Sequence, residues 1–499
     1  MILTRQPLSA RALPFGGARW RRRLRSALRW AWLARRRWAW LARRRAALPW
    51  LALAAISLVS LAARAAWLDA PCHQPCRRGT DHVLIFDERY YVNAARVIAG
   101  IHPPPGSPYA GAPLGVDPNA EHTPLAKLII AGSIELLGDR PLAWRLGSLV
   151  MGSLAILGMF ALVRAAGAGR WVAVAAAGLM AADNLMIVHG RIATLDIYAL
   201  AAMVWAAALY LRRRPLVAGV LIGVGLCAKL VAGEVLIALV LYEALLWRWG
   251  RGPTGPPVRR LAGAGAAAAL TFLALLAGLE HFAPPYDPVA RHLVTGGVWG
   301  EIHHIITYAA AQTSPGGPHG IASDPWGWLV DYKPIVYLNI NPARPAPGLE
   351  HIHPAVHFLG LISPPILLLA LPALALAAFR VATVHAPPAR SAPAGPPPAP
   401  SPSSPVAPTR ERPPHAAAAA PLAALAVAWV AGTYLPFVLF SLALARTSYL
   451  YYMVVVMPGL YAAVAWLLPA IRSHRRLLCL WLGLLVAAAV LAYPLTPLP

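Results

Sequence analysis

Eleven apolar runs constrain the fold of this chain more than any other feature of its sequence. A helix needs about 20 apolar residues to cross about 30 Å of hydrocarbon. The runs lie near residues 47–67, 142–164, 171–188, 192–211, 215–231, 232–247, 259–280, 356–379, 417–441, 448–470 and 475–493. The pair between 215 and 247 is the weakest, because Lys229 and Glu234 interrupt it. The pattern predicts an all-α, multi-pass membrane protein with about eleven transmembrane helices.

The distribution of arginine predicts the orientation of these helices. The chain is 58% hydrophobic and carries a formal net charge of +25. If residues 1–46 are cytoplasmic, every short arginine-rich loop lies inside, as the positive-inside rule requires. The excess charge then sets topology and attracts anionic lipid head groups. It gives no reason to expect nucleic acid as a partner, because a nucleic-acid-binding protein would show basic residues interleaved with aromatics on a soluble fold, and only the N-terminal tail resembles that pattern.

The same pattern divides the chain into four parts. Residues 1–46 form a basic cytoplasmic tail, 47–380 a transmembrane core, 381–416 a Pro/Ala-rich cytoplasmic linker, and 417–499 the C-terminal transmembrane helices. The core includes two structured outer loops, 68–141 and 281–355, and short amphipathic helices are expected near 88–99 and 124–137. The tail repeats WAWLARRR at 30–37 and 38–45. This repeat is either a helix on the inner membrane surface or a duplication in a disordered tail.

The four cysteines separate into two pairs. Cys227 and Cys479 lie in apolar runs, where cysteine packs as a small hydrophobe. Cys72 and Cys76 lie in an outer loop, where oxidation is allowed. A local disulfide or two free thiols are expected there. Two cysteines with one histidine fall short of a closed zinc shell, so no metal is predicted.

Acidic and basic side chains gather at the outer ends of the predicted helices. Charged groups in membrane segments are costly and usually functional. The set comprises Asp87, Glu88, Lys127, Arg145, Asp183, Arg191, Asp196, Lys229, Glu234 and Arg446. Cations can hold a phosphate, a carboxylate can accept a proton from a hydroxyl, and apolar helices can admit a lipid tail. The set predicts a site for a lipid-phosphate donor. A transporter is the alternative, but the chain shows no internal repeat and few charges at the bilayer midplane.

Several stretches, in order along residues 80–470, resemble the protein O-mannosyltransferase family of membrane-embedded, polyprenyl-phosphate-dependent glycosyltransferases. They are FDERYY (86–91), HTPLAKLII (122–130), WR (144–145), DNLMIVHGRIATLD (183–196), GVGLCAK (223–229), HGIASDPWGWLVDYKPIVYL (319–338) and RTSYLYYMVVVMPGLY (446–461). The acidic pair, HxPL and WR are shared with wider relatives that move sugars from lipid phosphates. The stretch around Trp326 and Trp328 is more particular to the O-mannosyl branch.

The resemblance implies a GT-C type fold and an inverting transfer of mannose from polyprenyl-phosphate-mannose to Ser or Thr hydroxyls of exported proteins. Asp87 is the expected general base, because a hydroxyl must lose its proton as it attacks. Arg145 and Lys229 are expected to stabilise the departing lipid phosphate. No cofactor is implied. The alternative acceptor is a glycolipid or cell-wall glycan.

Further roles follow from the matched positions. Glu88 either shares the base role, orients the acceptor or makes a structural hydrogen bond. Asp196 and Arg191 are expected to form an ion pair, although both also qualify as substrate-binding residues. His122 is expected to line the sugar pocket. Trp326 and Trp328 either stack on sugar or peptide or anchor at the membrane interface.

The chain also departs from the family pattern. Gly190 stands where a serine is more usual, and 281–355 is too short for the large soluble carbohydrate-binding module of the fungal and animal enzymes, in agreement with bacterial members. The expected partners are the donor lipid, an exported polypeptide and membrane lipids, with the secretion translocon as a further candidate. The expected location is the plasma membrane, with the active site facing outside.

Overall fold

The structure is a computed structural model that describes residues 47–72, 77–248, 257–340, 356–383 and 414–495. The basic tail with its tandem repeat and most of the Pro/Ala-rich linker lie outside these ranges. The chain divides into two units, Met1–Ala52 and Leu53–Pro499. All contacts described below lie within the second unit.

The first described helix covers Ala47–Ala65. The remaining helices are α2 (Glu88–Ile98), α3 (Leu125–Leu137), α4 (Pro141–Ala165), α5 (Arg170–Ala182), α6 (Asn184–His189), α7 (Asp196–Leu211), α8 (Pro215–Ala228), α9 (Glu234–Arg248), α10 (Pro257–Phe282), α11 (Gly297–Ala311), α12 (Pro325–Trp328), α13 (Pro364–Thr383), α14 (Pro414–Leu444), α15 (Met453–Ile471) and α16 (Arg475–Leu491). Short 3-10 turns cover Gly79–Asp81, Leu230–Gly233 and Leu450–Tyr452. Two antiparallel hairpins pair β1 (Tyr286–Asp287) with β2 (His292–Leu293) and β3 (Ile335–Ile340) with β4 (Val356–Gly360).

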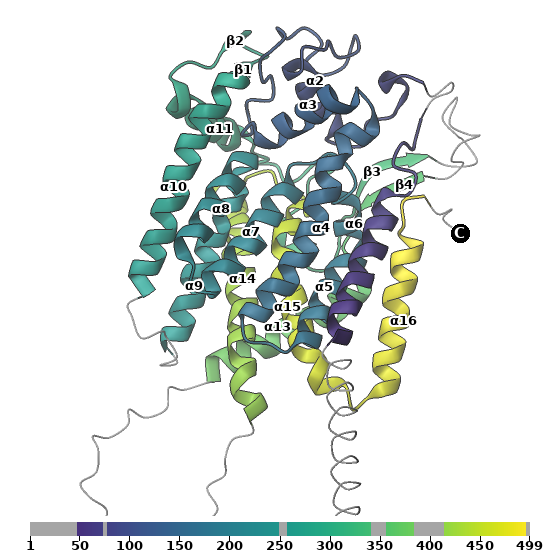
Figure 1. Ribbon diagram of the computed structural model, residues 1–499, viewed down its shortest axis with the longest axis vertical. Coiled ribbons are helices and arrows are strands. Elements are labelled where there is room, and N and C mark those ends of the chain that lie inside the picture. The colour runs from purple at the N-terminus through teal and green to yellow at the C-terminus, as the bar shows by residue number, and fades with distance from the viewer. Residues whose placement is uncertain (1–46, 73–76, 249–256, 341–355, 384–413, 496–499) are drawn as a thin grey trace, which may run out of the picture. The chain divides into compact units, whose positions relative to one another are not determined.

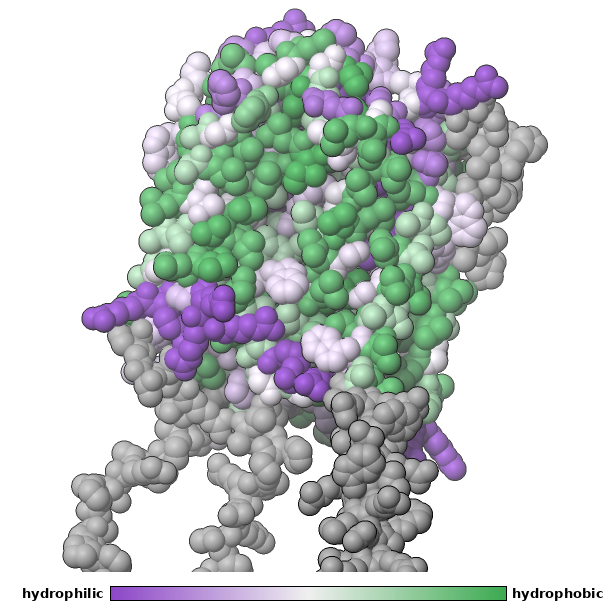
Figure 2. All heavy atoms as spheres, viewed as in Figure 1, coloured by the Kyte–Doolittle hydropathy of each residue, from purple (hydrophilic) through white to green (hydrophobic). Residues whose placement is uncertain are grey.

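The all-α membrane architecture is confirmed, whereas the number of spans is not. In the described part of the chain, seven helices are long and apolar enough to cross a membrane, and α5, α7 and α8 are shorter apolar helices. A helix lies within each of the eleven apolar runs. On the face in Figure 2, apolar side chains cover the long helices and hydrophilic ones gather toward both ends.

Two predicted spans differ from the structure. The run at 171–188 is interrupted at Asp183, which adopts an extended conformation between α5 and α6. The run at 356–379 begins with strand β4, and its helix starts only at Pro364. Hydropathy alone cannot distinguish a buried strand from a helix over so few residues.

Glycines let neighbouring helices approach closely where α8 packs against α10. Gly219 and Gly223 are one helical turn apart and face Ala264 and Ala268 of α10. A Cβ atom on Gly219 would overlap the carbonyl oxygen of Ala264, and one on Gly223 would lie 2.7 Å from that of Ala268. Small residues at this spacing are typical of tightly packed membrane helices.

The two long segments between spans lie at one end of the long helices (Figure 1). The first supplies α2 and α3, which agree with the amphipathic helices predicted near 88–99 and 124–137. The second supplies β1, β2, α11, α12 and the β3 strand. Hairpin β3–β4 contains an irregularity between Val336 and Leu338, so that Tyr337 is the extra residue on its strand. Both segments therefore contain ordered structure.

The cysteines agree with one of the open alternatives. Cys72 is disulfide-bonded, and its partner lies outside the described residues. Cys227 is free and buried, whereas Cys479 is free but exposed. The expectation that both cysteines are packed inside the protein is therefore confirmed only for Cys227.

The α8–α10 contact makes a stability prediction. Gly219→Ala should lower the thermal unfolding midpoint in detergent by several degrees, because the new methyl group must push the α10 backbone away. Gly265→Ala is the matched control: a Cβ atom there meets no other atom within 4 Å, so its midpoint should not fall. Equal midpoints for the two variants would show that the helices do not approach as closely as described.

Candidate active site

Glu88 is fully buried and forms the most highly connected ion pair in the described part of the chain. Its carboxylate accepts hydrogen bonds from Arg145 Nε at 2.8 Å and Nη2 at 2.7 Å. The backbone N–H groups of Ile85 and Ala193 donate to it at 2.8 Å each. A carboxylate with four donors is held in one orientation. Glu88 is therefore engaged as a structural anchor.

Arg145 has no donor left for a ligand. The guanidinium is fully buried and has five N–H groups. Beyond its bonds to Glu88, Nη1 donates to the carbonyls of Leu68 and Ala70, and Nη2 donates to the carbonyl of Val83. The expected contact of Arg145 with a lipid phosphate does not fit this geometry, because burial and carbonyl partners occupy the whole group.

Asp87 has the opposite environment from its neighbour. It immediately precedes α2 and is partly exposed. In the described part of the chain, no hydrogen bond to its carboxylate is formed. Desolvation raises the pKa of Asp87 from 3.8 to about 7, with the charge of Lys229 opposing the increase and that of Asp196 adding to it. Such a carboxylate exchanges protons near neutral pH, which suits a general base.

Phe86 orients the acidic residue that follows it. Its φ of 54° lies in the left-handed region, which bulky residues rarely adopt. The ring stacks on Tyr337 at 4.1 Å and meets the edge of Tyr451 at 5.5 Å. Strained backbone of this kind persists only where its surroundings hold it. Tyr337, from β3, lies in the stretch 319–338, and the sequence alone predicts no role for it.

His189 holds Tyr337 in turn. The His189 Nε2 atom lies 2.9 Å from the Tyr337 hydroxyl, and Nδ1 lies 3.2 Å from Thr194 Oγ1. Burial lowers the pKa of His189 to about 4, so its ring is neutral at pH 7. No signal in the sequence marks this role, because a histidine on a short helix is as easily a packed core residue.

Lys229 and Asp196 form the second ion pair of the site. Lys229 follows α8 in an extended conformation, Asp196 begins α7, and their side chains meet at 2.7 Å. The ammonium also lies 5.5 and 5.8 Å from the ring centroids of Tyr451 and Tyr452. It retains slight exposure, so it faces the same space as Asp87 from the helix bundle.

The predicted ion pair between Arg191 and Asp196 is wrong. Arg191 is fully buried and donates to the carbonyl of Trp67 at 2.6 Å and to the Tyr493 hydroxyl at 3.3 Å. Asp196 pairs with Lys229 instead. The two side chains are only five positions apart, but they contact different segments of the protein because the backbone between them forms an irregular turn. Their proximity in the sequence does not reveal this.

His122 lies at the start of the α3 region, where a buried lysine fixes the loop. Lys127 pairs with Asp117 at 2.6 Å and donates to the carbonyls of Asn119 and His122. The His122 ring lies 5.9 Å from Tyr91. Burial, with the charges of Lys229 and Lys127, holds the pKa of His122 well below 6.5. The ring is neutral, as a sugar-contacting histidine can be.

The two tryptophans of α12 have different environments. Trp328 is fully buried, packs against Tyr434, Phe437 and Tyr452, and donates from Nε1 to Ser323 Oγ at 2.9 Å. It cannot stack on a substrate in this arrangement. Trp326 is 52% exposed and remains available to a sugar, a peptide or the membrane interface.

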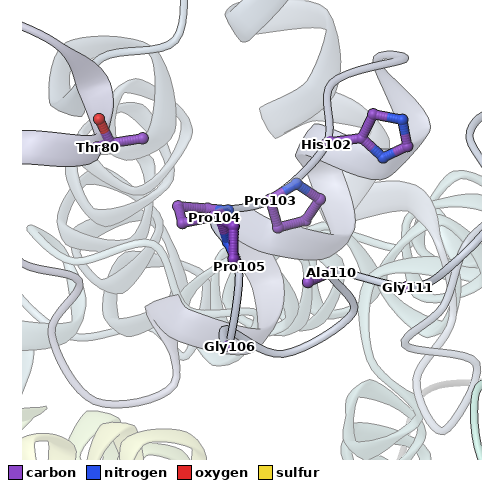
Figure 3. Close-up of a pocket in the computed structure, with 8 residues that line it drawn as sticks. All are labelled: Thr80, His102, Pro103, Pro104, Pro105, Gly106, Ala110 and Gly111. Carbon is purple, nitrogen blue, oxygen red and sulfur yellow. The ribbon is translucent and has the colours of Figure 1, made fainter.

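A surface cavity of about 840 Å³ lies apart from these residues. Figure 3 shows its lining: Thr80, His102, Pro103, Pro104, Pro105, Gly106, Ala110 and Gly111. None of these residues is among the charged residues of the site, Asp87, Glu88, Arg145, Asp196 and Lys229. Within the described ranges, no group of three or more His, Cys, Asp and Glu side chains could hold a metal ion.

Comparisons with known proteins agree with this architecture. Residues 121–276 match the family model for dolichyl-phosphate-mannose-protein mannosyltransferase. A polyprenol-phosphate-mannose–protein mannosyltransferase of Corynebacterium glutamicum is 25% identical over 315 residues, which are 51% of this chain and 60% of that protein's length. A structure of the S. cerevisiae protein O-mannosyltransferase Pmt1-Pmt2 complex bound to the sugar donor superposes with a TM-score of 0.60 and 12% identity, covering 89% of each chain.

The fold is therefore that of the GT-C membrane glycosyltransferases. The chain is therefore similar to protein O-mannosyltransferases, in sequence over residues 121–276 and over the stretch shared with the bacterial relative, and in fold.

The raised pKa of Asp87 predicts a pH-dependent stability effect. The folded state binds this proton more tightly than the unfolded chain, so ionisation between about pH 4 and 7 costs folding free energy. Asp87→Asn should therefore raise the thermal unfolding midpoint at pH 8 by a few degrees, and the gain should shrink as the pH falls toward 4.

Asp81→Asn is the control, because the pKa of Asp81 is shifted in the opposite direction from that of Asp87. Backbone N–H groups of Arg78 and Arg77 lower the pKa of Asp81, so its ionised form stabilises the fold and the variant should gain nothing at pH 8. A lower midpoint for Asp87→Asn at pH 8 would contradict the environment described for Asp87.

Proposed function

We propose that this protein transfers mannose from polyprenyl-phosphate-mannose to Ser or Thr hydroxyls of exported polypeptides at the outer face of the plasma membrane. The observation that carries the proposal is the contrast between two adjacent carboxylates. Glu88 is saturated with donors, whereas Asp87 is partly exposed with a pKa of about 7. Of the two, Asp87 is therefore the one proposed to accept a proton from a substrate.

The proposed reaction is one inverting displacement. The acceptor hydroxyl attacks the anomeric carbon as its proton passes to Asp87, and the bond from that carbon to the phosphate oxygen breaks. The electron pair leaves with the lipid phosphate, which needs no general acid because it departs as a stable anion. A single displacement requires no covalent sugar–enzyme intermediate.

Lys229 is the residue proposed to stabilise the leaving phosphate. Its ammonium keeps some exposure and has one carboxylate partner, Asp196, so it can donate further hydrogen bonds. Asp196 orients Lys229 and adds to the basicity of Asp87. Arg145 is proposed to act indirectly, by fixing Glu88 and hence the start of α2. Arg191 is likewise given a role in positioning the turn before α7.

His122 and Trp326 are proposed to contact the sugar or the acceptor. His122 is partly exposed beside Tyr91, and Trp326 is half exposed on a segment that packs next to the site. The burial of Trp328 supports a packing role for that residue instead. Mannose as the donor sugar is supported by the family match, since the family model and the bacterial relative are both named for mannosyl transfer.

The outward orientation rests on charge. The arginine-rich short loops and the basic N-terminus assign one side to the cytoplasm, and the two long segments that carry Asp87 and Trp326 then face outward. Exported chains emerging from the translocon are the proposed acceptors, which makes the translocon a proposed neighbour.

The test supplies radiolabelled polyprenyl-phosphate-mannose and a membrane-impermeant Ser/Thr peptide to right-side-out vesicles. Label should appear on the peptide. Asp87→Asn should reduce transfer at least about a hundredfold, the usual contribution of a general base, while Asp81→Asn, the same change in the same loop, stays within twofold. Label on a glycolipid or glycan would support the alternative acceptor. No transfer with any acceptor would overturn the proposal.

The transfer rate should also depend on pH through Asp87. A base must be ionised, so the rate should rise with pH to a plateau with a midpoint near 7. Because the charge of Lys229 lowers the pKa of Asp87, Lys229→Met should move this midpoint to higher pH as well as reduce the rate. A rate that is constant from pH 5 to 8, with chemistry limiting, would exclude Asp87 as the base.

A further inference from the structure

Arg64, in the first membrane helix, is a buried cation that the proposed reaction does not use. It is 1% exposed. It donates to the carbonyl of Ser60 at 3.1 Å, to the carbonyl of Leu149 at 3.4 Å and to Ser153 Oγ at 3.0 Å. Among the described residues no carboxylate pairs with it. A buried charge without a counter-charge is expensive, and in a membrane helix it usually has a function.

Two glycines make the space that this guanidinium fills. A Cβ atom on Gly152 of α4 would overlap Arg64 Nη1, and one on Gly190 would lie 2.9 Å from the same atom and 3.0 Å from Arg64 Cδ. A Cβ atom at either position would therefore require Arg64 to shift.

The turn that begins at Gly190 connects three groups of the site. The first is His189, which immediately precedes the turn and holds Tyr337. The backbone N–H of Ala193 donates to Glu88 at 2.8 Å, and Asp196 at its end holds Lys229 at 2.7 Å. Every residue of the turn is buried. Arg64 lies against the start of this turn and is tied to α4 on its other side.

We propose that Arg64 is a positioning residue of the transfer site: its guanidinium, held by hydrogen bonds to α4 in the space left by Gly152 and Gly190, fixes the turn that orients Glu88 and the Lys229–Asp196 pair. It touches no substrate. Its hydrogen bonds to Leu149 and Ser153 of α4 hold the guanidinium in place, and the guanidinium in turn limits the movement of Gly190. This role rests on the proposed transfer function.

The first test compares Arg64→Lys with Arg64→Met, measuring mannosyl transfer to peptide per folded protein, with the folded amount taken from the size-exclusion peak. Met fills the volume and removes the cost of a buried charge, so it should unfold at a temperature no lower than the wild type but lose about tenfold or more in rate. Lys keeps donors for the carbonyls and should stay within about threefold of the wild type. A packing role predicts the reverse order, and that order would overturn the proposal.

The second test is a double-mutant cycle. Gly152→Ala should slow transfer by displacing Arg64, and adding it to Arg64→Met should cost little more, because the displaced group is already gone. Gly158→Ala is the matched control on the same helix: its Cβ atom would lie 2.6 Å from Val204 Cγ2 and away from Arg64. The fold reduction in transfer rate caused by Gly158→Ala should multiply with the fold reduction caused by Arg64→Met.

The outcomes separate the two proposals. If the wild type transfers mannose and the Gly152 cycle is multiplicative, Arg64 is not a positioning residue and the transfer function stands. If the wild type transfers nothing to any acceptor, the proposed function fails first. Unfolding midpoints of all variants, measured in parallel, identify any loss that comes from instability.

Discussion

The buried pair between Glu88 and Arg145 is the interaction on which the site depends. It joins the segment after the first membrane helix, the stretch before α2, helix α4 and the turn before α7, through side-chain bonds and five backbone contacts. Breaking such a pair by removing one partner costs about 3–5 kcal/mol, because the other charge is left buried. Few arrangements of these segments satisfy all the donors and acceptors at once, so the pair specifies one geometry.

The same interaction explains why two adjacent carboxylates behave differently. Glu88 is the first residue of α2 and is buried, where Arg145 pairs with it. Asp87 lies one residue earlier, after a strained Phe86 whose ring is held by Tyr337. Its carboxylate is desolvated without being paired, and that combination raises its pKa. His189 and His122 are neutral and add no positive charge nearby. Lys229 is therefore the cation with the largest effect on the pKa of Asp87.

Much of the fold followed from the sequence because apolar length and hydrophobic periodicity are local signals. Each apolar run contains a helix, and the amphipathic α2 and α3 lie where their periodicity predicted them. The partners of the charged residues were harder. Asp196 pairs with Lys229, 33 positions away, instead of with Arg191, and Trp328 is a core residue despite its place in a polar, loop-like segment. The first error arose from treating neighbours in the chain as neighbours in space, and the second arose because the residues that bury Trp328 lie more than 100 positions away in the chain.

The sequence by itself determined that the chain is a helical membrane protein with acidic and basic groups concentrated at one side, because hydrophobic length and charge bias act residue by residue. It also singled out the pair at 87 and 88. Only the tertiary structure decided which of the two is saturated and which is reactive, which cation faces Asp87, and why Gly190 stands opposite Arg64. Burial, pairing and close approach depend on segments that are distant in the chain, so they exist only after the helices have packed.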